Sequence, residues 1–169
     1  LENVRILEDA GAAAIVMHSL FEEQITNDQL AEFAHTETHA GSFSEATSYF
    51  PEMEDYALGP HRYLEQISRI KASVDIPVIG SLNGISPGGW IDHARLIEQA
   101  GADALELNVY YVATDPDESG LEVEQRTLDI LRSVKESITI PIAVKLSPFF
   151  SSPGHFAKEL DALGASGVI

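Results

Sequence analysis

The sequence predicts an α/β protein with a parallel sheet, and two spacings carry this prediction. Strand-like segments that open with Ile-Pro begin at Ile76 and Ile140, and each follows a helix-like stretch. Junctions of the form Ala-Gly-Ala or Leu-Gly-Ala interleave with them, with their glycines at Gly11, Gly101 and Gly164. Strands that alternate with helices need right-handed crossovers, which build a parallel sheet. Because the repeat is two strand–helix units long, it favours a (β/α)8 (TIM) barrel, whose functional groups gather at the carboxyl ends of the strands.

Each element follows from its own local signals. Apolar residues at helical spacing before Gly11 indicate a first helix, because glycine commonly follows a helix C-terminus. Pro87 suits the first turn of a later helix, and Asp115-Pro116-Asp117 is typical of a turn in the loop 110–120. The strands are apolar throughout, as expected of strands covered on both faces. In chain order, the expected helices are 2–10, 61–73, 87–100, 121–136 and 154–163, and the expected strands are 12–18, 76–82, 103–109, 140–146 and one that begins at 166.

The chain is shorter than a complete barrel. It has 169 residues, whereas a (β/α)8 barrel typically takes about 250. It opens in a helix with no strand before it and stops at Gly167-Val168-Ile169, in the first residues of a strand. We therefore expect 1–169 to be a fragment of a single domain that holds about half the strands of a barrel. A long irregular stretch, 19–60, interrupts the alternation, and loops of this length are usually functional or disordered.

Composition excludes several classes of partner. The net charge of −17 disfavours nucleic acid and anionic membranes, because like charges repel. The absence of cysteine excludes disulfides and thiolate metal sites and fits a reducing cytoplasm, and we expect no metal. No apolar run approaches the roughly 18 residues that suggest a membrane span. We expect a cytoplasmic protein that acts on a small molecule.

Polar residues inside apolar strands are the informative exceptions. Lys145 stands near the end of its strand, where it is either a cation that faces a ligand or a lysine that reaches solvent or pairs with Glu106. Asn108 ends the strand that contains Glu106, and the two share a face because they are two residues apart. An amide offers donors and an acceptor, which suits the edge of a heterocycle, although Asn108 also fits a turn at the strand end.

Two other strands also end in polar groups. His18 and Ser19 end the first strand, and Ser81 and Asn83 end the second. The carboxyl ends of parallel strands share one rim of a barrel, so four consecutive strands predict one site there.

At these residues the chain resembles a known family. Glu106-Leu107-Asn108 at one strand end, followed by Ile-Pro-Ile-Ala-Val-Lys-Leu-Ser-Pro at 140–148, is similar to the dihydroorotate dehydrogenase family of FMN-dependent barrels. The Gly-Ala-Ser-Gly-Val-Ile ending, 164–169, resembles the start of that family's next strand. The likeness follows nearly the whole chain in order and is strongest from Pro77 onward.

The resemblance implies an FMN site. The family's asparagine after Glu-Leu and its lysine after Val contact the flavin, and they correspond to Asn108 and Lys145. A lysine there stabilises negative charge on the reduced flavin. His18 stands where the family often has a lysine, Ser19 matches the following serine, and we assign both to the cofactor site together with Asn83.

The chain departs from the family after Asn108. Tyr111 stands at the position of the base, which is cysteine or serine in the family, and Ala113 stands where the family has a substrate asparagine. Tyrosine acts as a base only if its pKa falls well below its usual value of about 10, for example next to Lys145. The segment 34–60 corresponds to a loop that covers the substrate.

The resemblance therefore implies a dihydroorotate dehydrogenase-like oxidoreductase, of a kind associated with pyrimidine biosynthesis. It would oxidise a C–C bond of a dihydropyrimidine-type substrate by hydride transfer to flavin, with Tyr111 and Lys145 as catalytic residues. The 169-residue fragment by itself is expected to be inactive, and a homodimer of the full-length protein is one assembly that the resemblance allows. Two alternatives remain: a flavin-free barrel lyase or isomerase in which Lys145 forms a Schiff base, and a barrel that has lost catalysis and serves binding.

Overall fold

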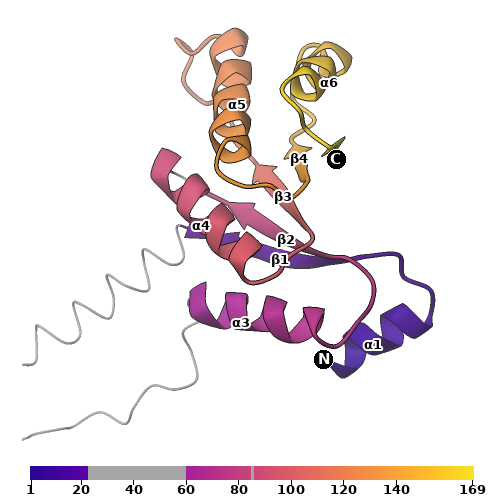
Figure 1. Cartoon of the computed structure of the whole chain (residues 1–169). Coiled ribbons are helices and arrows are strands. Elements are labelled where there is room, and N and C mark those ends of the chain that lie inside the picture. Colours follow the sequence, from indigo (N-terminus) through magenta and orange to yellow (C-terminus); the bar gives the residue numbers. More distant parts are fainter. Residues whose placement is uncertain (23–59, 85) are drawn as a thin grey trace, which may run out of the picture.

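The structure is a computed structural model that describes residues 1–22, 60–84 and 86–169. In these residues five strands form one parallel sheet in the order β1-β2-β3-β4-β5 (Figure 1). The strands are β1 (Ile15–Phe21), β2 (Val78–Asn83), β3 (Ala104–Val109), β4 (Ile142–Leu146) and β5 (Gly167–Val168). The helices are α1 (Glu2–Asp9), α3 (Pro60–Lys71), α4 (Pro87–Gln99), α5 (Gly120–Lys135) and α6 (Pro153–Ala162). The predicted α/β class and the parallel sheet are confirmed.

The first strand is the element that differs most from its predicted bounds. It was predicted at 12–18 but begins at Ile15, because 12–14 are alanines and the β-branched residues start at Ile15. The other strands and the helices begin and end within two residues of their predicted bounds. Strands β2 and β4 begin one residue after Pro77 and Pro141, since proline has no N–H to donate to a neighbouring strand.

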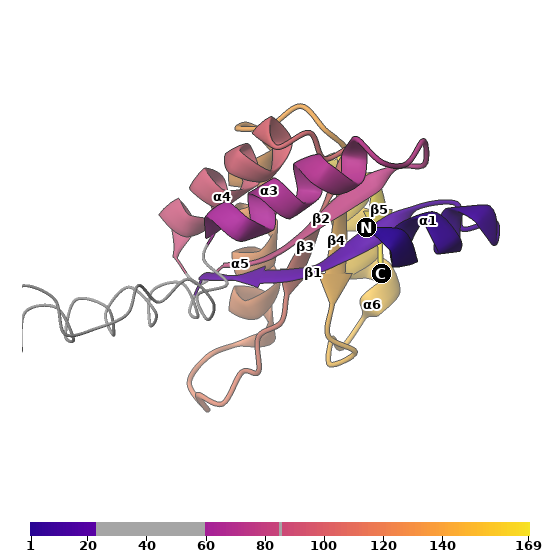
Figure 2. The same cartoon turned by 90° about the horizontal axis from the view of Figure 1, so that it is seen from below.

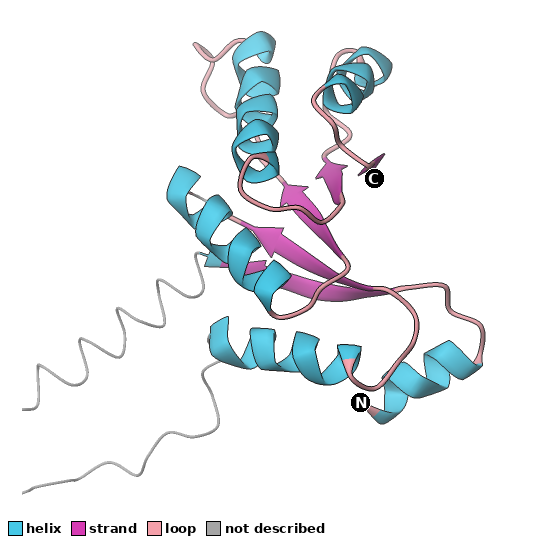
Figure 3. Ribbon diagram, in the orientation of Figure 1, coloured by secondary structure: helices cyan, strands magenta, loops and turns pink. Residues whose placement is uncertain are grey.

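The order of the strands decides where the helices lie. Each strand is added beside the previous one, so right-handed crossovers place the connecting helices on one side of the sheet. Helices α3, α4, α5 and α6 contact one another in turn and form an arc outside the strands (Figures 2 and 3). The strand side chains buried in this apolar layer include Val78, Leu82, Leu105, Leu107, Ile142 and Val144. We call the opposite side of the sheet the inner face.

The sequence repeat is also a structural repeat. The carbonyl oxygen of Pro77 accepts the N–H of Ile15 at 2.8 Å, and that of Pro141 accepts the N–H of Leu105 at 2.9 Å. The glycines that follow α4 and α6 have φ angles of 95° and 89°, in the region that favours glycine. Equivalent residues therefore end equivalent helices and align equivalent strands.

Two glutamates connect the helix ends to later strands. Glu8, near the end of α1, accepts the backbone N–H groups of Asp75 and Ile76 at 2.7 and 3.1 Å, just before β2. Glu98, near the end of α4, accepts the N–H of Thr139 at 2.7 Å and that of the next residue at 3.2 Å, just before β4. The hydroxyl of Thr139 also donates to Glu98. This side-chain hydrogen bond has the largest effect on the pKa of the Glu98 carboxyl, and together with the backbone hydrogen bond from Thr139 it lowers that pKa.

Part of the predicted organisation lies outside the described residues. In the predicted segment 34–60, all residues before Pro60, where α3 begins, lie outside the described part of the chain. The predicted role of this segment as a substrate loop therefore stays a prediction. None of the helices in the described ranges combines the length and the apolar character that crossing a membrane requires.

The Glu98 connection leads to a prediction about stability. Replacing Glu98 by alanine removes an acceptor of three hydrogen bonds, so we expect the free energy of unfolding to fall by about 1 kcal/mol at neutral pH. The pKa of this carboxyl is lowered by folding, so its stabilisation is present above the ordinary carboxyl pKa and is lost as the pH falls through the lowered value.

Denaturant unfolding at neutral and acidic pH measures this effect. Glu65→Ala is the control, because Glu65 is an exposed residue of α3 and its loss changes the net charge equally. A Glu98→Ala protein as stable as Glu65→Ala at neutral pH would contradict the prediction.

Candidate functional site

A row of polar side chains crosses three adjacent strands on the inner face. Ser19 of β1 stands opposite Ser81 of β2, and Ser81 stands opposite Glu106 of β3. The hydroxyl oxygens of Ser19 and Ser81 are 2.7 Å apart, and the Ser81 hydroxyl donates to Oε1 of Glu106 at 2.7 Å. Because Ser81 uses its single proton on Glu106, Ser19 must be the donor in the bond between the two serines.

Glu106 carries a charge in a place that water hardly reaches. Its relative exposure is 5%, and Ser81 beside it is completely buried. The ammonium nitrogen of Lys145 lies 3.7 Å from Oε1 of Glu106. A buried carboxylate without a partner is strongly destabilising, so Lys145 and Ser81 together make Glu106 tolerable at this position. The predicted alternative that Lys145 pairs with Glu106 is therefore observed.

Asn108 lies one step further along the inner face, opposite Lys145 in the register of β3 and β4. Its amide nitrogen donates to the hydroxyl oxygen of Ser19 at 3.4 Å. Ser19 gives its own proton to Ser81, so it can only accept from Asn108, and this fixes the amide with its oxygen turned away from Ser19. That oxygen, Oδ1, is buried and has no hydrogen-bond partner. An unpartnered buried acceptor of this kind suits a ligand that carries an N–H donor.

A tyrosine from α3 supports Ser81 from the other side. The register of β1 on β2 shifts between Val16 and Ser19. There the Tyr63 hydroxyl accepts the N–H of Ser81 at 2.9 Å and donates to its carbonyl oxygen at 3.1 Å. The Tyr63 hydroxyl thus satisfies backbone groups of Ser81 that a neighbouring strand would otherwise bind. Burial, opposed by the hydrogen bond to Ser81, raises the pKa of Tyr63 to about 12.

The remaining predicted cofactor residues are placed differently. His18 belongs to the shifted part of β1, and its ring packs edge-on against Tyr63 with the ring centres 5.1 Å apart. It therefore faces α3 and is not part of the row that holds Ser19. Asn83 ends β2 opposite Phe21 and, two residues after Ser81, lies on the inner face. The structure thus brings Ser19, Asn108 and Lys145 together and separates His18 from them.

Tyr111 follows β3 in the loop that leads to α5. Its hydroxyl donates to Oε2 of Glu118 at 2.8 Å, and the guanidinium of Arg126 lies 4.2 Å from its ring centre. Arg126 also forms an ion pair with Glu118. These contacts connect the loop to the first turns of α5, and they differ from the predicted contact between Tyr111 and Lys145.

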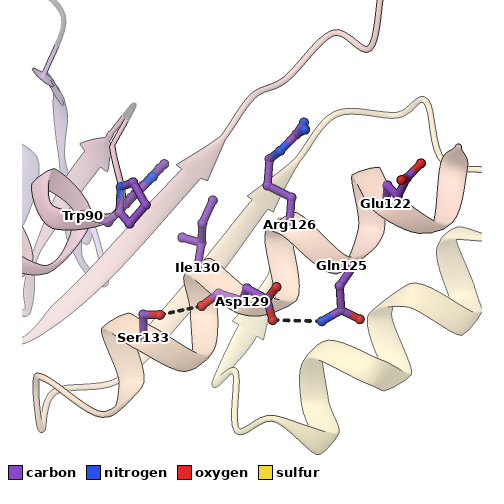
Figure 4. A pocket seen from close by; sticks show the side chains of 8 residues that line it. Trp90, Glu122, Gln125, Arg126, Asp129, Ile130 and Ser133 are labelled. Carbon is purple, nitrogen blue, oxygen red and sulfur yellow. Dashed lines mark hydrogen bonds between the residues drawn. The ribbon is translucent and has the colours of Figure 1, made fainter. Parts of the chain in front are cut away.

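A cavity in the described residues lies elsewhere. It measures about 360 Å³ and opens between α4 and α5, on the helix layer and not on the inner face (Figure 4). Its polar lining is engaged locally, because Asp129 accepts from Gln125 and from Ser133. The described part of the chain also holds no group of histidine and carboxylate side chains suited to a metal ion.

Sequence reasoning did not assign three residues of the site. Ser81 and Glu106 were noticed as polar residues in strands but were given no binding role, although their positions near the strand ends were the available signal. Tyr63 gave no signal, because an aromatic residue on the apolar side of a helix is usually a core residue.

The double hydrogen bond of Tyr63 leads to a second prediction. In Tyr63→Phe two backbone groups of Ser81 lose their partner, so we expect the free energy of unfolding to fall by about 1–3 kcal/mol at neutral pH. Folding raises the pKa of Tyr63, so its stabilisation is complete below the ordinary pKa of about 10 and is lost as the pH rises toward about 12.

The difference in stability between the parent and Tyr63→Phe should therefore shrink between pH 10 and 12, as measured by denaturant unfolding. Tyr110→Phe, at an exposed tyrosine, is the matched control and should leave stability unchanged. Equal stability of the two variants at neutral pH would refute the role of the hydroxyl.

Comparison with known proteins finds distant relatives in sequence that cover part of the chain. No family model matches the chain. The catalytic subunit of dihydroorotate dehydrogenase B (NAD(+)) from Geobacillus sp. is 29% identical over 114 residues, covering 65% of this chain and 36% of that protein. The NAD-dependent dihydropyrimidine dehydrogenase subunit PreA of Escherichia coli K12 is 29% identical over 124 residues, covering 70% of this chain and 30% of that protein. The chain thus spans about a third of the length of the curated relatives it matches.

Solved structures show the fold. Dihydrodipicolinate synthase from Oceanobacillus iheyensis superposes with a TM-score of 0.58 at 18% identity, covering 99% of this chain and 43% of that one. The enzyme of the same name from Aquifex aeolicus gives a TM-score of 0.55 at 14% identity, covering 99% and 61%. At such identities the likeness concerns the fold alone. In sequence the predicted resemblance is confirmed: parts of the chain are distantly similar to proteins named dihydroorotate dehydrogenase and dihydropyrimidine dehydrogenase.

Proposed function

We propose that the chain is part of an FMN-dependent oxidoreductase, similar to dihydroorotate dehydrogenases, that uses the inner face as its flavin site. The observation that carries this proposal is the buried, unpartnered oxygen of Asn108 directly opposite Lys145. Sequence similarity to dihydroorotate and dihydropyrimidine dehydrogenases also supports the proposal that the protein is a dehydrogenase.

The proposed fold is a partial (β/α)8 barrel, with 1–169 as part of a single barrel domain. Among the described residues, strictly sequential strands with their connecting helices on one side leave the inner face without a covering layer of these helices, and closure of the sheet on itself is the usual way to cover such a face. A doubly wound sheet would require the strand order to reverse, and the order β1-β2-β3-β4-β5 contains no reversal.

The inner face fits the chemistry of a flavin ring. The pyrimidine edge of the ring alternates carbonyl oxygens with an N–H group. The Asn108 oxygen can accept from such a donor, while the ammonium of Lys145 and the side-chain amide groups of the site can donate to the carbonyl oxygens of the ring. When bound, the flavin supplies the acceptor for a hydride from the substrate. Lys145 then holds positive charge where negative charge develops, and Asn108 orients the ring.

The proposed substrate is a dihydropyrimidine-type ring whose C–C bond is oxidised, because the sequence relatives are named for such substrates. The proton acceptor in that reaction is assigned to Tyr111 by family position, and its hydroxyl points to Glu118. Removal of the substrate proton therefore requires the loop after β3 to release Tyr111, or another residue to act as base. A homodimer of the full-length protein stays part of the proposal.

The alternative in which Lys145 forms a Schiff base fits the geometry less well. A Schiff-base lysine attacks as a free amine, whereas Lys145 lies next to the buried carboxylate of Glu106. The pair uses Lys145 as a cation. Borohydride reduction in the presence of a carbonyl substrate would attach that substrate to Lys145 only in the Schiff-base mechanism.

The flavin proposal is tested on the full-length protein. It should purify with bound FMN, seen in its absorbance spectrum. Asn108→Ala and Lys145→Met should each weaken FMN binding by about tenfold or more, because each removes a polar contact to the ring. Lys158→Met, at an exposed lysine of α6, is the matched control and should bind FMN as the parent does.

Fluorescence titration of the apoprotein with FMN gives the dissociation constants. A full-length parent that binds no FMN would overturn the proposal. Unchanged affinity in both variants would show that the flavin site lies elsewhere.

A further inference from the structure

Glu106 is the one buried acidic side chain among the described residues, and neither hydride transfer nor proton removal uses it. It accepts from Ser81, lies beside Lys145 and occupies the middle strand of the described sheet. Burying a carboxylate is unfavourable even when it is paired, and apolar replacements of such pairs are often neutral or stabilising. Stability alone therefore does not account for a charge at this position.

We propose that Glu106 is the positioning residue of the site, which holds the ammonium of Lys145 and sets the direction of the hydrogen bonds that orient Asn108. The proposal rests on the proposed flavin function and names a residue that acts through others. It does not require Glu106 to touch the ligand.

The first step concerns the direction of the hydrogen bonds. An ionised carboxylate can only accept, so Ser81 must donate to Glu106. Ser19 must then donate to Ser81, and Asn108 must donate to Ser19. The charge on Glu106 thereby decides that Asn108 presents its oxygen, and not its amide nitrogen, to a ligand. A neutral amide in place of Glu106 can donate as well as accept, which leaves that direction undetermined.

The second step concerns Lys145. Its side chain is 43% exposed, whereas that of Glu106 is 7% exposed, so the carboxylate is the fixed partner and the lysine is the movable one. The ammonium nitrogen lies 3.7 Å from Oε1 of Glu106, and the backbone of Lys145 stands opposite that of Asn108 in the register of β3 and β4. Two facing strand positions thus carry an acceptor, Asn108, and a cation, Lys145. This pair matches a ligand edge in which an N–H adjoins a carbonyl, which is an imide or amide edge.

The third step concerns charge. Glu106 and Lys145 together are neutral, so the pair adds no net positive charge to the site. Replacing Glu106 by glutamine leaves the lysine charge uncompensated, and a bound flavin should then become easier to reduce, because its reduced form carries more negative charge. A purely structural role for Glu106 would not shift the reduction potential in a defined direction.

The first experiment needs no flavin. In the full-length apoprotein, the rate at which an amine-acylating reagent modifies Lys145 is measured by peptide mass spectrometry. Glu106→Gln should raise this rate by about threefold or more, since the ammonium loses its carboxylate partner. Ser81→Ala keeps the carboxylate and should leave the rate near that of the parent. Glu65→Gln, an exposed site on α3 with the same change in charge, is the control.

The second experiment uses the flavin-loaded protein. Glu106→Gln should raise the reduction potential of the bound FMN above that of Glu65→Gln. Ser81→Ala should weaken FMN binding severalfold, because it interrupts the hydrogen bonds to Asn108 without removing a charge. Combining Lys145→Met with Glu106→Gln should abolish the effect of Glu106→Gln on the potential, because the two residues act as a pair.

The outcomes separate the two proposals. If the parent binds no FMN, the flavin proposal fails while the acylation rates still decide the pairing of Glu106 with Lys145. If the parent binds FMN but Glu106→Gln changes neither the acylation rate nor the potential relative to Glu65→Gln, the positioning role is refuted. Should Glu106→Gln fold poorly, unchanged FMN affinity in Ser81→Ala would refute the orientation of Asn108 by itself.

Discussion

The architecture depends on one constraint, which is that every crossover between neighbouring parallel strands has the same hand. With the strands in strictly sequential order, the connecting helices are directed to a single side, and that side receives the large apolar side chains of the strands. The inner face is thereby freed from making the main core. Only on a face that is not needed for that core can consecutive strands carry serine, glutamate, asparagine and lysine.

Within the inner face, the charge of Glu106 has consequences for residues that it does not touch. A lone hydroxyl chain can run in either direction, and an asparagine at its end can present either of its polar atoms. The ionised carboxylate removes this freedom, and Tyr63 holds the backbone of Ser81 in place from the helix side. The site is therefore organised from its buried end outward, toward the carboxyl ends of the strands.

The sequence predicted the α/β class, the parallel sheet and the element bounds well because its signals were local and repeated. The Ile-Pro segments and the glycine junctions mark strand starts and helix ends, and proline and glycine act through their own backbones, whatever surrounds them. The prediction that Glu106 and Asn108 share one face of the sheet followed from the two-residue period of a strand. These features needed no knowledge of tertiary contacts.

The sequence was less informative in β1, where a register shift interrupts the alternation of side chains between the two faces of the sheet. The register shift in β1 turns His18 toward Tyr63 and so reverses the face that simple alternation would give it. Nothing near His18 in the sequence signals this shift, because the tyrosine that stabilises it is 45 positions further along the chain. The hydrogen bond from Tyr111 to Glu118 likewise depends on how the loop meets α5.

The departures from the family at Tyr111 and Ala113 lie in the loop after β3, apart from the residues on the inner face. Asn108, Lys145 and Ser19 lie together on the inner face, whereas Tyr111, at the position of the family's base, is held by Glu118 and Arg126 at the start of α5. In the proposed function, binding of a planar cofactor and removal of a substrate proton therefore fall to different elements, the strands and the loop after β3. A loop can change its residues without disturbing strands whose alignment is set by the repeat. This arrangement is consistent with the proposed flavin site on the strands and with a substrate chemistry set by the loop, in which Tyr111 could act as the base only after leaving Glu118.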